Sequence, residues 1–224
     1  MDSVQEPSLF EQVMPFLLKG AVVTVELSVV AMAIALVLGL IAALARLSRS
    51  RIARIIATIY VEVIRGTPLL VQLFIVYYGL PSYGIRLEAF TAGVITLGIH
   101  YGAYLSEAYR AGILSIDKGQ WEAAASIGMT RTQIMRDIIL RQAIRVILPT
   151  IGNYFISMLK DSALTATISL SELLRAGQLR IAITFRAMDI YLMVAAIYLL
   201  LSYPFSLMLR RLEAKASRGH GTQS

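Results

Sequence analysis

Residues 115–149 read SIDKGQWEAAASIGMTRTQIMRDIILRQAIRVILP, and this stretch is the longest interval of the chain that cannot cross a membrane. Charged side chains recur through it, although long apolar runs precede and follow it. Such a polar interval between apolar runs is a loop on one side of a membrane. The charged residues are Asp117, Lys118, Glu122, Arg131, Arg136, Asp137, Arg141 and Arg145.

The same stretch carries its own helix signals. Asp117 has the character of a helix N-cap, and Thr130 stands three residues before a glutamine, which is the spacing of a capping box. Gly128 between them suits the left-handed residue that ends a helix. The pattern predicts a helix over 118–127, a tight turn and a second helix over 131–147.

The composition excludes a soluble domain. Hydrophobic residues make up 57% of the 224 residues, which leaves too little polar surface for a chain in water. The chain has no cysteine, so a disulfide framework and thiolate chemistry are excluded. The net charge of +7 comes from Lys and Arg in loops between apolar runs, a distribution that indicates membrane orientation and not nucleic-acid binding.

Five apolar runs are long enough to cross a membrane as helices, which takes about 20 residues each. The fourth is the weakest, because Lys160 and Asp161 interrupt it. The acidic start of the chain lacks the basic residues of a secretory signal, so the first run is expected to stay as a span. The predicted spans are 21–44, 55–80, 90–114, 146–168 and 188–209.

The distribution of Lys and Arg gives the orientation. The first loop, the loop 115–149 and the tail 210–224 are rich in both residues, so they are expected to be cytoplasmic. The exception is the segment 169–186, which carries three arginines on the predicted outer side, and a short outer helix over 171–179 is expected there. The fold class is therefore all-α integral membrane: an outer N-terminal segment 1–20, then a transmembrane domain 21–209 with five helices, N-out/C-in.

The second span contains polar residues that a lipid-facing helix would not carry. Glu62 and Arg65 share a helix face and form either a neutralising pair or part of a water-filled path. Thr67 before a proline predicts an N-cap and a new half-helix, whose free N–H groups favour an anionic substrate group. Gln72 lies one turn further on.

The third and fourth spans add further polar side chains. Tyr104 and Glu107 share a face of the third span, and Glu107 could equally form a structural salt bridge with Arg110. His100 is more simply explained as a packed histidine than as a ligand. In the fourth span a polar stripe must face protein or water and not lipid, and it favours a substrate path over a buried structural network. Its members are Asn153, Ser157, Lys160 and Asp161.

The first helix of the loop is small and polar, so a partner protein can approach it closely. Its second helix has an apolar stripe that could alternatively lie in the membrane interface. Trp121 is the expected anchor, Glu122 the expected partner of a basic residue, and Gly128 the residue that sets the angle between the helices. The candidate contact residues are Gln120, Trp121, Glu122, Ala123, Ala124 and Gly128.

No constellation of a soluble enzyme is present in the sequence. The chain has no GxxxxGK[ST] loop for ATP, no GxSxG and no HExxH. Two isolated histidines do not favour metal chemistry. The chain is therefore not expected to be an enzyme or to hold a cofactor of its own.

Several of these motifs resemble those of one family. Glu122-Ala123-Ala124 with Gly128 resembles the EAA signature of the permease subunits of bacterial ABC importers. The runs RGTPLLVQLF and LKD, and the GAYLSEAYRAGI segment, resemble the polar amino-acid branch, and residues 115–130 are most similar to L-cystine permeases. Arg141 stands where that family usually has proline, so the second loop helix is expected to run straight into the fourth span.

The resemblance implies a type I importer permease in the bacterial inner membrane. Two permease subunits, identical or similar, would form the path, and two ATPase subunits carrying ATP and Mg would bind the EAA loops. A periplasmic amino-acid-binding protein would deliver substrate to the outer face. The resemblance also implies alternating access. A zwitterionic amino acid needs a cation for its carboxylate and an anion for its ammonium group, so we expect Arg65 with the half-helix at 67–69 to bind the first and Asp161, or Glu107, the second. Asn153 and Ser157 are the expected hydrogen-bond partners of the substrate.

Two other functions fit parts of the sequence. An ion-coupled secondary amino-acid carrier would need no ATPase, but five spans are few for it and no inverted repeat is visible. A passive anchor that recruits soluble proteins would not need Arg65, Lys160 and Asp161 inside the membrane, where each costs about 2.5–3.5 kcal/mol.

Overall fold

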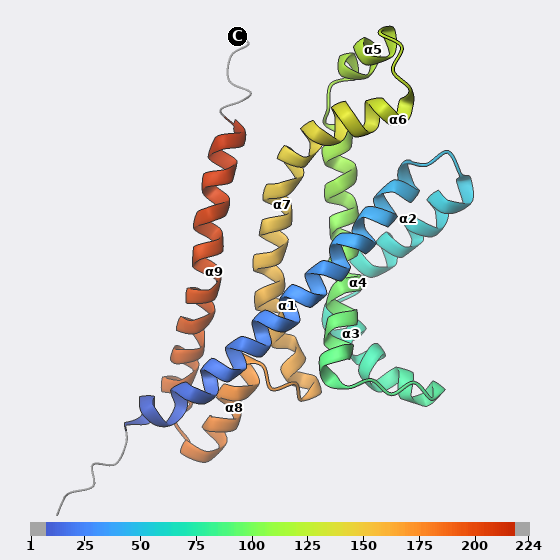
Figure 1. Ribbon diagram of the computed structural model, residues 1–224. Coiled ribbons are helices and arrows are strands. Elements are labelled where there is room, and N and C mark those ends of the chain that lie inside the picture. The colour runs from blue at the N-terminus through green and yellow to red at the C-terminus, as the bar shows by residue number, and fades with distance from the viewer. Residues whose placement is uncertain (1–7, 218–224) are drawn as a thin grey trace, which may run out of the picture.

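The computed structural model describes residues 8–217, and within them the chain is helical throughout (Figure 1). The predicted segment 1–20 and tail 210–224 therefore lie in part outside the described residues. The α-helices are α1 (Leu9–Leu47), α2 (Arg51–Arg65), α3 (Leu69–Phe74), α4 (Ala89–Leu114), α5 (Lys118–Ser126), α6 (Arg131–Gln133), α7 (Leu140–Asp161), α8 (Leu173–Thr184) and α9 (Ala187–Ser217). Tighter or wider helical segments are η1 (Ile75–Gly79), η2 (Leu80–Tyr83), η3 (Ile134–Ile139) and η4 (Ser162–Ile168).

Helix α1 begins before the predicted first span. The Ser8 hydroxyl accepts from the Glu11 backbone N–H, while the Glu11 carboxylate accepts from the Ser8 backbone N–H at 2.8 Å. This capping box starts the helix at Leu9, whereas the apolar run alone indicated residue 21. Residues 9–20 are thus a continuation of the first helix and not a separate segment.

Helix α4 lies at the centre of the bundle and packs against α1 along most of its length (Figure 1). The close approach of α4 to α1 requires glycine. A Cβ atom added to Gly98 of α4 would lie only 2.7 Å from Cγ2 of Ile34 on α1, which is too short for a van der Waals contact. Leu97 and Leu105 are fully buried in the same contact. The α1–α4 pair therefore fixes the position of everything that the other helices place against α4.

The predicted second span is a bent pair and not one helix. Helix α2 and the helical segment Leu69–Tyr83, which α3 opens, meet at 104° across Gly66, Thr67 and Pro68, so the break predicted from proline is confirmed. The predicted N-cap was wrong: Pro68 occupies that position, and the Thr67 hydroxyl instead donates to the Val63 carbonyl at 2.9 Å. Thr67 therefore closes α2 and does not open α3.

Helix α7 continues the second helix of the loop into the fourth predicted span. The chain stays helical from residue 131 to residue 168, and Arg141 lies in the first turn of α7. The predicted straight run was wrong, because the wider turns of η3 end two residues before Arg141 and the chain changes direction between α6 and α7 (Figure 1). Helix α7 ends at Asp161, where the tighter η4 takes over, so the weak point of the predicted fourth span is a real change of helix type.

Helix α8 is the short helix expected at 171–179, and it begins two residues later. Glu172 is its N-cap, and the carboxylate accepts from the backbone N–H groups of Leu174 and Arg175 at 2.9 and 2.8 Å. The same carboxylate accepts from the Tyr198 hydroxyl of α9 at 2.7 Å, and it is fully buried. Glu172 therefore attaches α8 to the last helix.

The apolar character of the helices supports a membrane protein, with a smaller number of clear spans than predicted. Among residues 8–217, two helices, α1 and α9, are long and apolar enough to cross a membrane, or three if the bent pair counts as one span. Helices α4 and α7 do not meet that criterion, because polar side chains interrupt them. Five spans and the N-out/C-in orientation therefore stay predictions.

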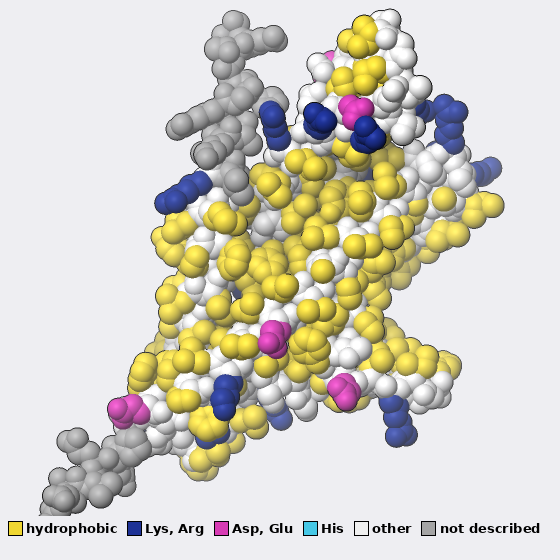
Figure 2. Space-filling view, viewed as in Figure 1, with side chains coloured by type: hydrophobic (Ala, Val, Ile, Leu, Met, Phe, Trp, Pro, Cys, Tyr) yellow, Lys and Arg dark blue, Asp and Glu magenta, His cyan; other side chains and the backbone are white. Residues whose placement is uncertain are grey.

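The two ends of the molecule differ in the elements that they carry. In Figure 1, α5 and α6 form one end, and α8 and the start of α1 form the other. In the space-filling view, yellow side chains cover the side between these ends, and Lys and Arg gather toward both ends (Figure 2). This banded surface is the one expected of a protein that sits across a bilayer.

Candidate functional site: a charged interior and a coupling hairpin

The hairpin of α5, α6 and η3 follows the local signals in the sequence closely. The Asp117 carboxylate accepts from the Gly119 backbone N–H at 2.7 Å and caps α5. Thr130 and Gln133 form the predicted capping box, with the glutamine side chain accepting from the Thr130 backbone N–H at 2.8 Å. Gly128 takes φ +80°, the left-handed conformation that turns the chain between the two helices.

The two faces of α5 have different surroundings. Ala124 is only 3% exposed and packs with Ile134 and Ile139 inside the hairpin, so it does not face a partner as expected. Trp121 is half-buried against the same cluster. Glu122 and Ala123 are exposed, and their side of α5 is available to another protein.

Two further hairpin residues have roles that their sequence context did not predict. Gln120 accepts from the Gln142 side chain of α7 at 3.1 Å, which ties α5 to the helix that continues into the membrane. Ile127 is 77% exposed beside Gly128, and a large apolar side chain in that position suits a protein contact. The hydrogen bond between Gln120 and Gln142 therefore connects α5 directly to α7.

Glu107 on α4 lies at the centre of three arginines. Its Oε1 atom is 2.6 Å from Arg46 Nη1 and 3.5 Å from Arg65 Nη1, and its Oε2 atom is 3.0 Å from Arg110 Nη2. The predicted salt bridge with Arg110 is confirmed, and two more arginines join it. Within residues 8–217, Glu62 forms no ion pair with Arg65, so the simple neutralising pair was wrong.

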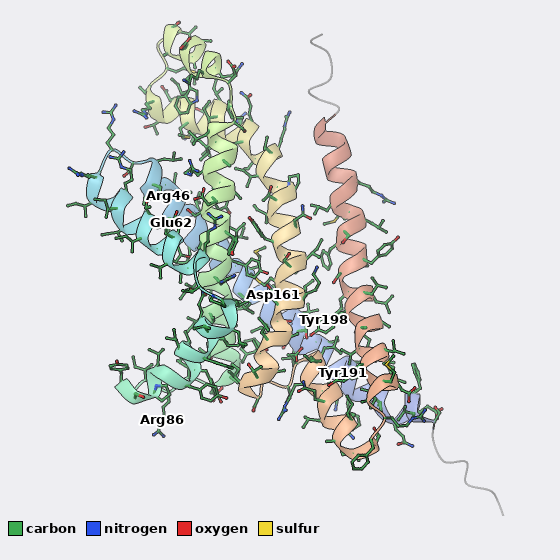
Figure 3. All side chains as sticks on the ribbon, turned by 180° about the vertical axis from the view of Figure 1, so that it is seen from behind. Arg46, Glu62, Arg86, Asp161, Tyr191 and Tyr198 are labelled. Atoms are coloured by element: carbon green, nitrogen blue, oxygen red, sulfur yellow. The ribbon has the colours of Figure 1, made fainter. Side chains whose placement is uncertain are left out.

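Asp161 has a different environment. It accepts a hydrogen bond of 2.6 Å from the Tyr101 hydroxyl and forms no ion pair among the residues that the structure describes. Figure 3 places Asp161 near the middle of the bundle, with Arg46 closer to the end that carries α5. Asp161 is partly exposed, so its second oxygen remains open to a further donor.

An aromatic cluster joins the two charged groups. The Arg65 guanidinium lies over the Tyr104 ring at 5.3 Å from its centroid. The Tyr104 ring packs against Tyr154 at 5.8 Å, and Tyr101 packs against Tyr154 at 6.1 Å between centroids. Tyr101 and Tyr104 also contact each other at 6.4 Å, so Arg65 and Asp161 both contact one three-ring cluster contributed by α4 and α7.

Gln72 supports the corner between α2 and α3 and does not line the path freely. Its Nε2 atom donates to the Ile64 carbonyl at 2.7 Å and to the Thr67 hydroxyl at 2.9 Å. Its Oε1 atom lies 3.0 Å from His100 Nδ1. His100 is buried, so its interpretation as a packed histidine is confirmed.

The polar stripe of α7 is only partly assembled into this site. Asp161 joins the aromatic cluster, whereas Asn153 and Lys160 are exposed and Ser157 is half-buried. Within residues 8–217 no group of three or more His, Cys, Asp or Glu side chains could hold a metal ion. The stripe is therefore an open face of α7 and not a closed network within one copy of the chain.

Three residues of the site were given no role, because their partners are distant in sequence. Arg46 was counted only as a loop charge, but it lies 61 residues from Glu107 along the chain. Tyr101 was noted as a polar residue of the third span without a partner, and Tyr154 was not noted; both take part through the packing of α4 against α7. Their only signal was the occurrence of tyrosine at helical spacing from known polar residues.

A membrane bundle with charges in its interior and an exposed hairpin at one end is typical of a membrane transport protein. Residues 35–218 match the family described as "Binding-protein-dependent transport system inner membrane component". The match covers most of the chain, and the chain belongs to this family of ABC importer permeases.

Individual relatives agree with the family assignment. The chain is 42% identical over 203 residues to the glutamine transport system permease protein GlnP of Escherichia coli K12, covering 90% of this chain and 93% of that one. It is 41% identical over 208 residues to the L-cystine transport system permease protein TcyB of Bacillus subtilis 168, covering 91% and 88%. A crystal structure titled an amino acid ABC transporter with histidines superposes with a TM-score of 0.88 at 41% identity, covering 94% and 100%.

These comparisons establish the general role of the chain. It is the membrane-embedded permease subunit of an amino-acid ABC importer, with the type I importer fold. In this family ATP is hydrolysed by a separate subunit and a binding protein supplies the substrate. The alternative of an ion-coupled carrier is not favoured.

Proposed function

We propose that this permease carries a zwitterionic amino acid with an uncharged polar side chain across the inner membrane by alternating access. The observation that supports this proposal is the cluster of tyrosine rings that contacts both Arg65 and Asp161. One cationic and one anionic group on the same path match the two charges of an amino-acid backbone. Because Arg65 and Asp161 are both used by the backbone charges, no charge on the substrate side chain is needed for binding.

Arg65 is the group assigned to the substrate carboxylate. Its side chain is 40% exposed, and its contact with Glu107 is longer than the contacts of the other two arginines. It can therefore exchange this partner for a substrate carboxylate at low cost. The free N–H groups near residue 69, at the start of α3, lie on the same corner and add a favourable partial charge.

Asp161 is the group assigned to the substrate ammonium. It carries one neutral hydrogen bond, whereas Glu107 is already neutralised by arginines. Glu107 thus sets the position of Arg65 and is a weaker candidate for the ammonium group. Asn153, Ser157 and Lys160, on the open face of α7, and Tyr104 complete the proposed path.

The complete transporter has further parts in this proposal. The chain crosses the membrane five times, N-out/C-in, and pairs with a second copy or a similar permease that covers the open face of α7. Two ATPase subunits, which hold ATP and Mg, bind the hairpin. A periplasmic binding protein delivers the amino acid at the α8 end.

Coupling to the ATPase is assigned to the exposed side of α5. Glu122 pairs with a basic residue of the ATPase, and Ala123 permits close approach of the helices. The exposed edge of Trp121 and the apolar side chain of Ile127 add apolar contact. The Gln120–Gln142 hydrogen bond and the turn at Gly128 then pass the motion to α7.

The substrate is best identified by direct uptake. Residues 115–130 are most similar to cystine permeases, but in this proposal the hairpin binds the ATPase and does not contact substrate. Relatives of similar sequence identity are named for glutamine and for cystine, so they do not distinguish the two substrates. The experiment reconstitutes the permease with its ATPase and binding protein and measures ATP-driven uptake of labelled glutamine, cystine, arginine and glutamate. The proposal expects uptake of glutamine or cystine, and preferred uptake of arginine or glutamate would contradict it.

The coupling role is tested by Glu122→Lys. The variant should lower ATPase co-purification and uptake together while leaving membrane insertion unchanged. Thr132→Lys is the matched control, because Thr132 is exposed on the other helix of the hairpin and the same positive charge is introduced there. Undiminished uptake by the Glu122 variant would refute the coupling role.

A further inference from the structure

The α8 end of the molecule carries positive charge that the transport site does not use. Lys19, Arg175, Arg180 and Arg186 lie in α1, α8 or the turn after α8, on the predicted outer side, where basic residues are normally scarce. Arg186 is accounted for by its ion pair with Asp189 at 2.8 Å. Two of the others, Lys19 and Arg180, line one groove.

This groove lies between α1 and α8 and has a volume of about 340 Å³. At its floor α1 and α8 are in close contact. A Cβ atom added to Gly20 of α1 would lie only 2.9 Å from Cβ of Ala176 on α8, so glycine is needed there. The volume is comparable to that of small-ligand pockets, which hold roughly 300–1,000 Å³. It suits a lipid headgroup, with the chains of the lipid left outside.

The polar groups of the groove are complementary to an anion. The Arg180 guanidinium carbon lies 3.2 Å from the centroid of the Phe16 ring, so the ring holds the flat face of the guanidinium and leaves its N–H edges available. Lys19 and the Ser171 hydroxyl line the same groove, and no Asp or Glu is among its lining residues. Glu26 follows Lys19 by seven residues, about 10 Å along α1, and does not line the groove.

The groove is bordered by apolar surface. Val22 of α1 is 56% exposed on the turn after Lys19, and Val30 is 43% exposed about three turns after Lys19, beyond the exposed Glu26. Figure 2 shows basic side chains over the start of α1 next to a largely yellow surface, in which a magenta acidic side chain also stands. A ligand in the groove therefore meets cations at one end and a largely apolar surface at the other.

We propose that this groove binds the phosphate headgroup of an anionic phospholipid, with the acyl chains lying along α1. Arg180 and Lys19 contact the phosphate, and Ser171 donates a further hydrogen bond. An acidic segment of a partner protein fits the cations but not the apolar border. The proposal requires only that the chain is embedded in a membrane, so it stands whether or not the substrate assignment holds.

The test uses native mass spectrometry of the detergent-purified complex of permease and ATPase, titrated with phosphatidylglycerol or phosphatidylethanolamine. The wild type should bind phosphatidylglycerol more tightly. In the double variant Lys19→Gln, Arg180→Gln, phosphatidylglycerol binding should weaken roughly 10- to 30-fold, to the level of phosphatidylethanolamine. The conservative double variant Lys19→Arg, Arg180→Lys should keep the preference, which separates loss of the site from misfolding.

The matched control is Arg86→Gln with Arg175→Gln, which removes two positive charges from the same end of the molecule but not from the groove. It should retain phosphatidylglycerol affinity within about twofold. Unchanged phosphatidylglycerol binding by the groove variant would overturn the proposal. So would a groove variant that loses only its association with the binding protein while its lipid preference stays intact, because the groove would then be a protein-docking site.

Discussion

Two regions of the interior each contain a carboxylate, and they differ in how the negative charge is compensated. Around Glu107, on α4, three arginines from different parts of the chain lie within 3.5 Å. Around Asp161, at the end of α7, the described contact is one tyrosine hydroxyl at 2.6 Å. The first region carries more positive than negative charge, and the second retains an uncompensated negative charge.

The difference indicates different roles. A carboxylate that is saturated by guanidinium groups holds helices together, because removing it would leave the largely buried Arg46 and two partly exposed arginines without their counter-charge. A partly exposed carboxylate with one neutral donor is costly in a membrane protein unless a cation reaches it during function. The comparison thus indicates a structural role for Glu107 and a substrate-binding role for Asp161, although both are acidic residues inside predicted spans.

The largest effect on transport is expected for Asp161→Asn. Loss of the charge removes the attraction for the substrate ammonium group, and uptake should fall roughly 100-fold, as for a lost charged hydrogen bond. Assembly with the ATPase should be unchanged. Uptake kinetics in proteoliposomes test this, and wild-type kinetics would remove Asp161 from the site.

Glu107→Gln should mainly affect stability. The variant leaves Arg46, Arg65 and Arg110 close together without their counter-charge, which should destabilise the fold by about 2 kcal/mol, since solvent screens the partly exposed Arg65 and Arg110. Melting temperature in detergent is the measurement, and a fall of roughly 4–8 °C is expected. Glu62→Gln is the control, because Glu62 is exposed and outside this cluster. An unchanged melting temperature with lost uptake would move Glu107 into the substrate site.

Tyr101→Phe tests the single hydrogen bond that Asp161 accepts. It removes the hydroxyl that donates to Asp161 and keeps the ring in the aromatic cluster. The Asp161 side chain should then lose its orientation, and KM should change roughly tenfold, as for one hydrogen bond to a charged group. Tyr104→Phe, whose ring stays over Arg65, serves as the control with a smaller expected change in KM.

The smallest effect is expected for Gln72→Leu, at the corner between α2 and α3. The variant loses the hydrogen bonds that close this corner and leaves His100 without its described partner. Unfolding free energy should fall by about 1–2 kcal/mol, with uptake reduced only a few fold. A complete loss of uptake would place Gln72 in direct contact with substrate and not at a structural corner.

The hairpin was predictable because its signals are local. Asp117, Thr130 and Gly128 each act on residues at most three positions away, so sequence spacing was sufficient to place both helices. The break at Pro68 was predictable for the same reason. The Thr67 hydroxyl was misassigned, because in that turn it can satisfy either the helix before it or the helix after it.

The sequence predicted which charged residues lie in the interior, but it did not predict which of them contact each other. The sequence correctly marked Arg65, Glu107 and Asp161 as costly side chains that need partners. It could not show that Arg46 reaches Glu107, because that contact depends on how α1 packs against α4 through glycines such as Gly98. Burial of Ala124 in the hairpin likewise depends on packing between helices.

The assignment of the two carboxylates is tested most directly by binding of an amino acid and its α-hydroxy analogue, which lacks the ammonium group. Binding is measured to the purified permease–ATPase complex without binding protein, for the wild type, Asp161→Asn and Glu107→Gln. The account predicts that preference for the amino acid over the analogue disappears in Asp161→Asn and persists in Glu107→Gln. Preference that persists in Asp161→Asn and disappears in Glu107→Gln would contradict it.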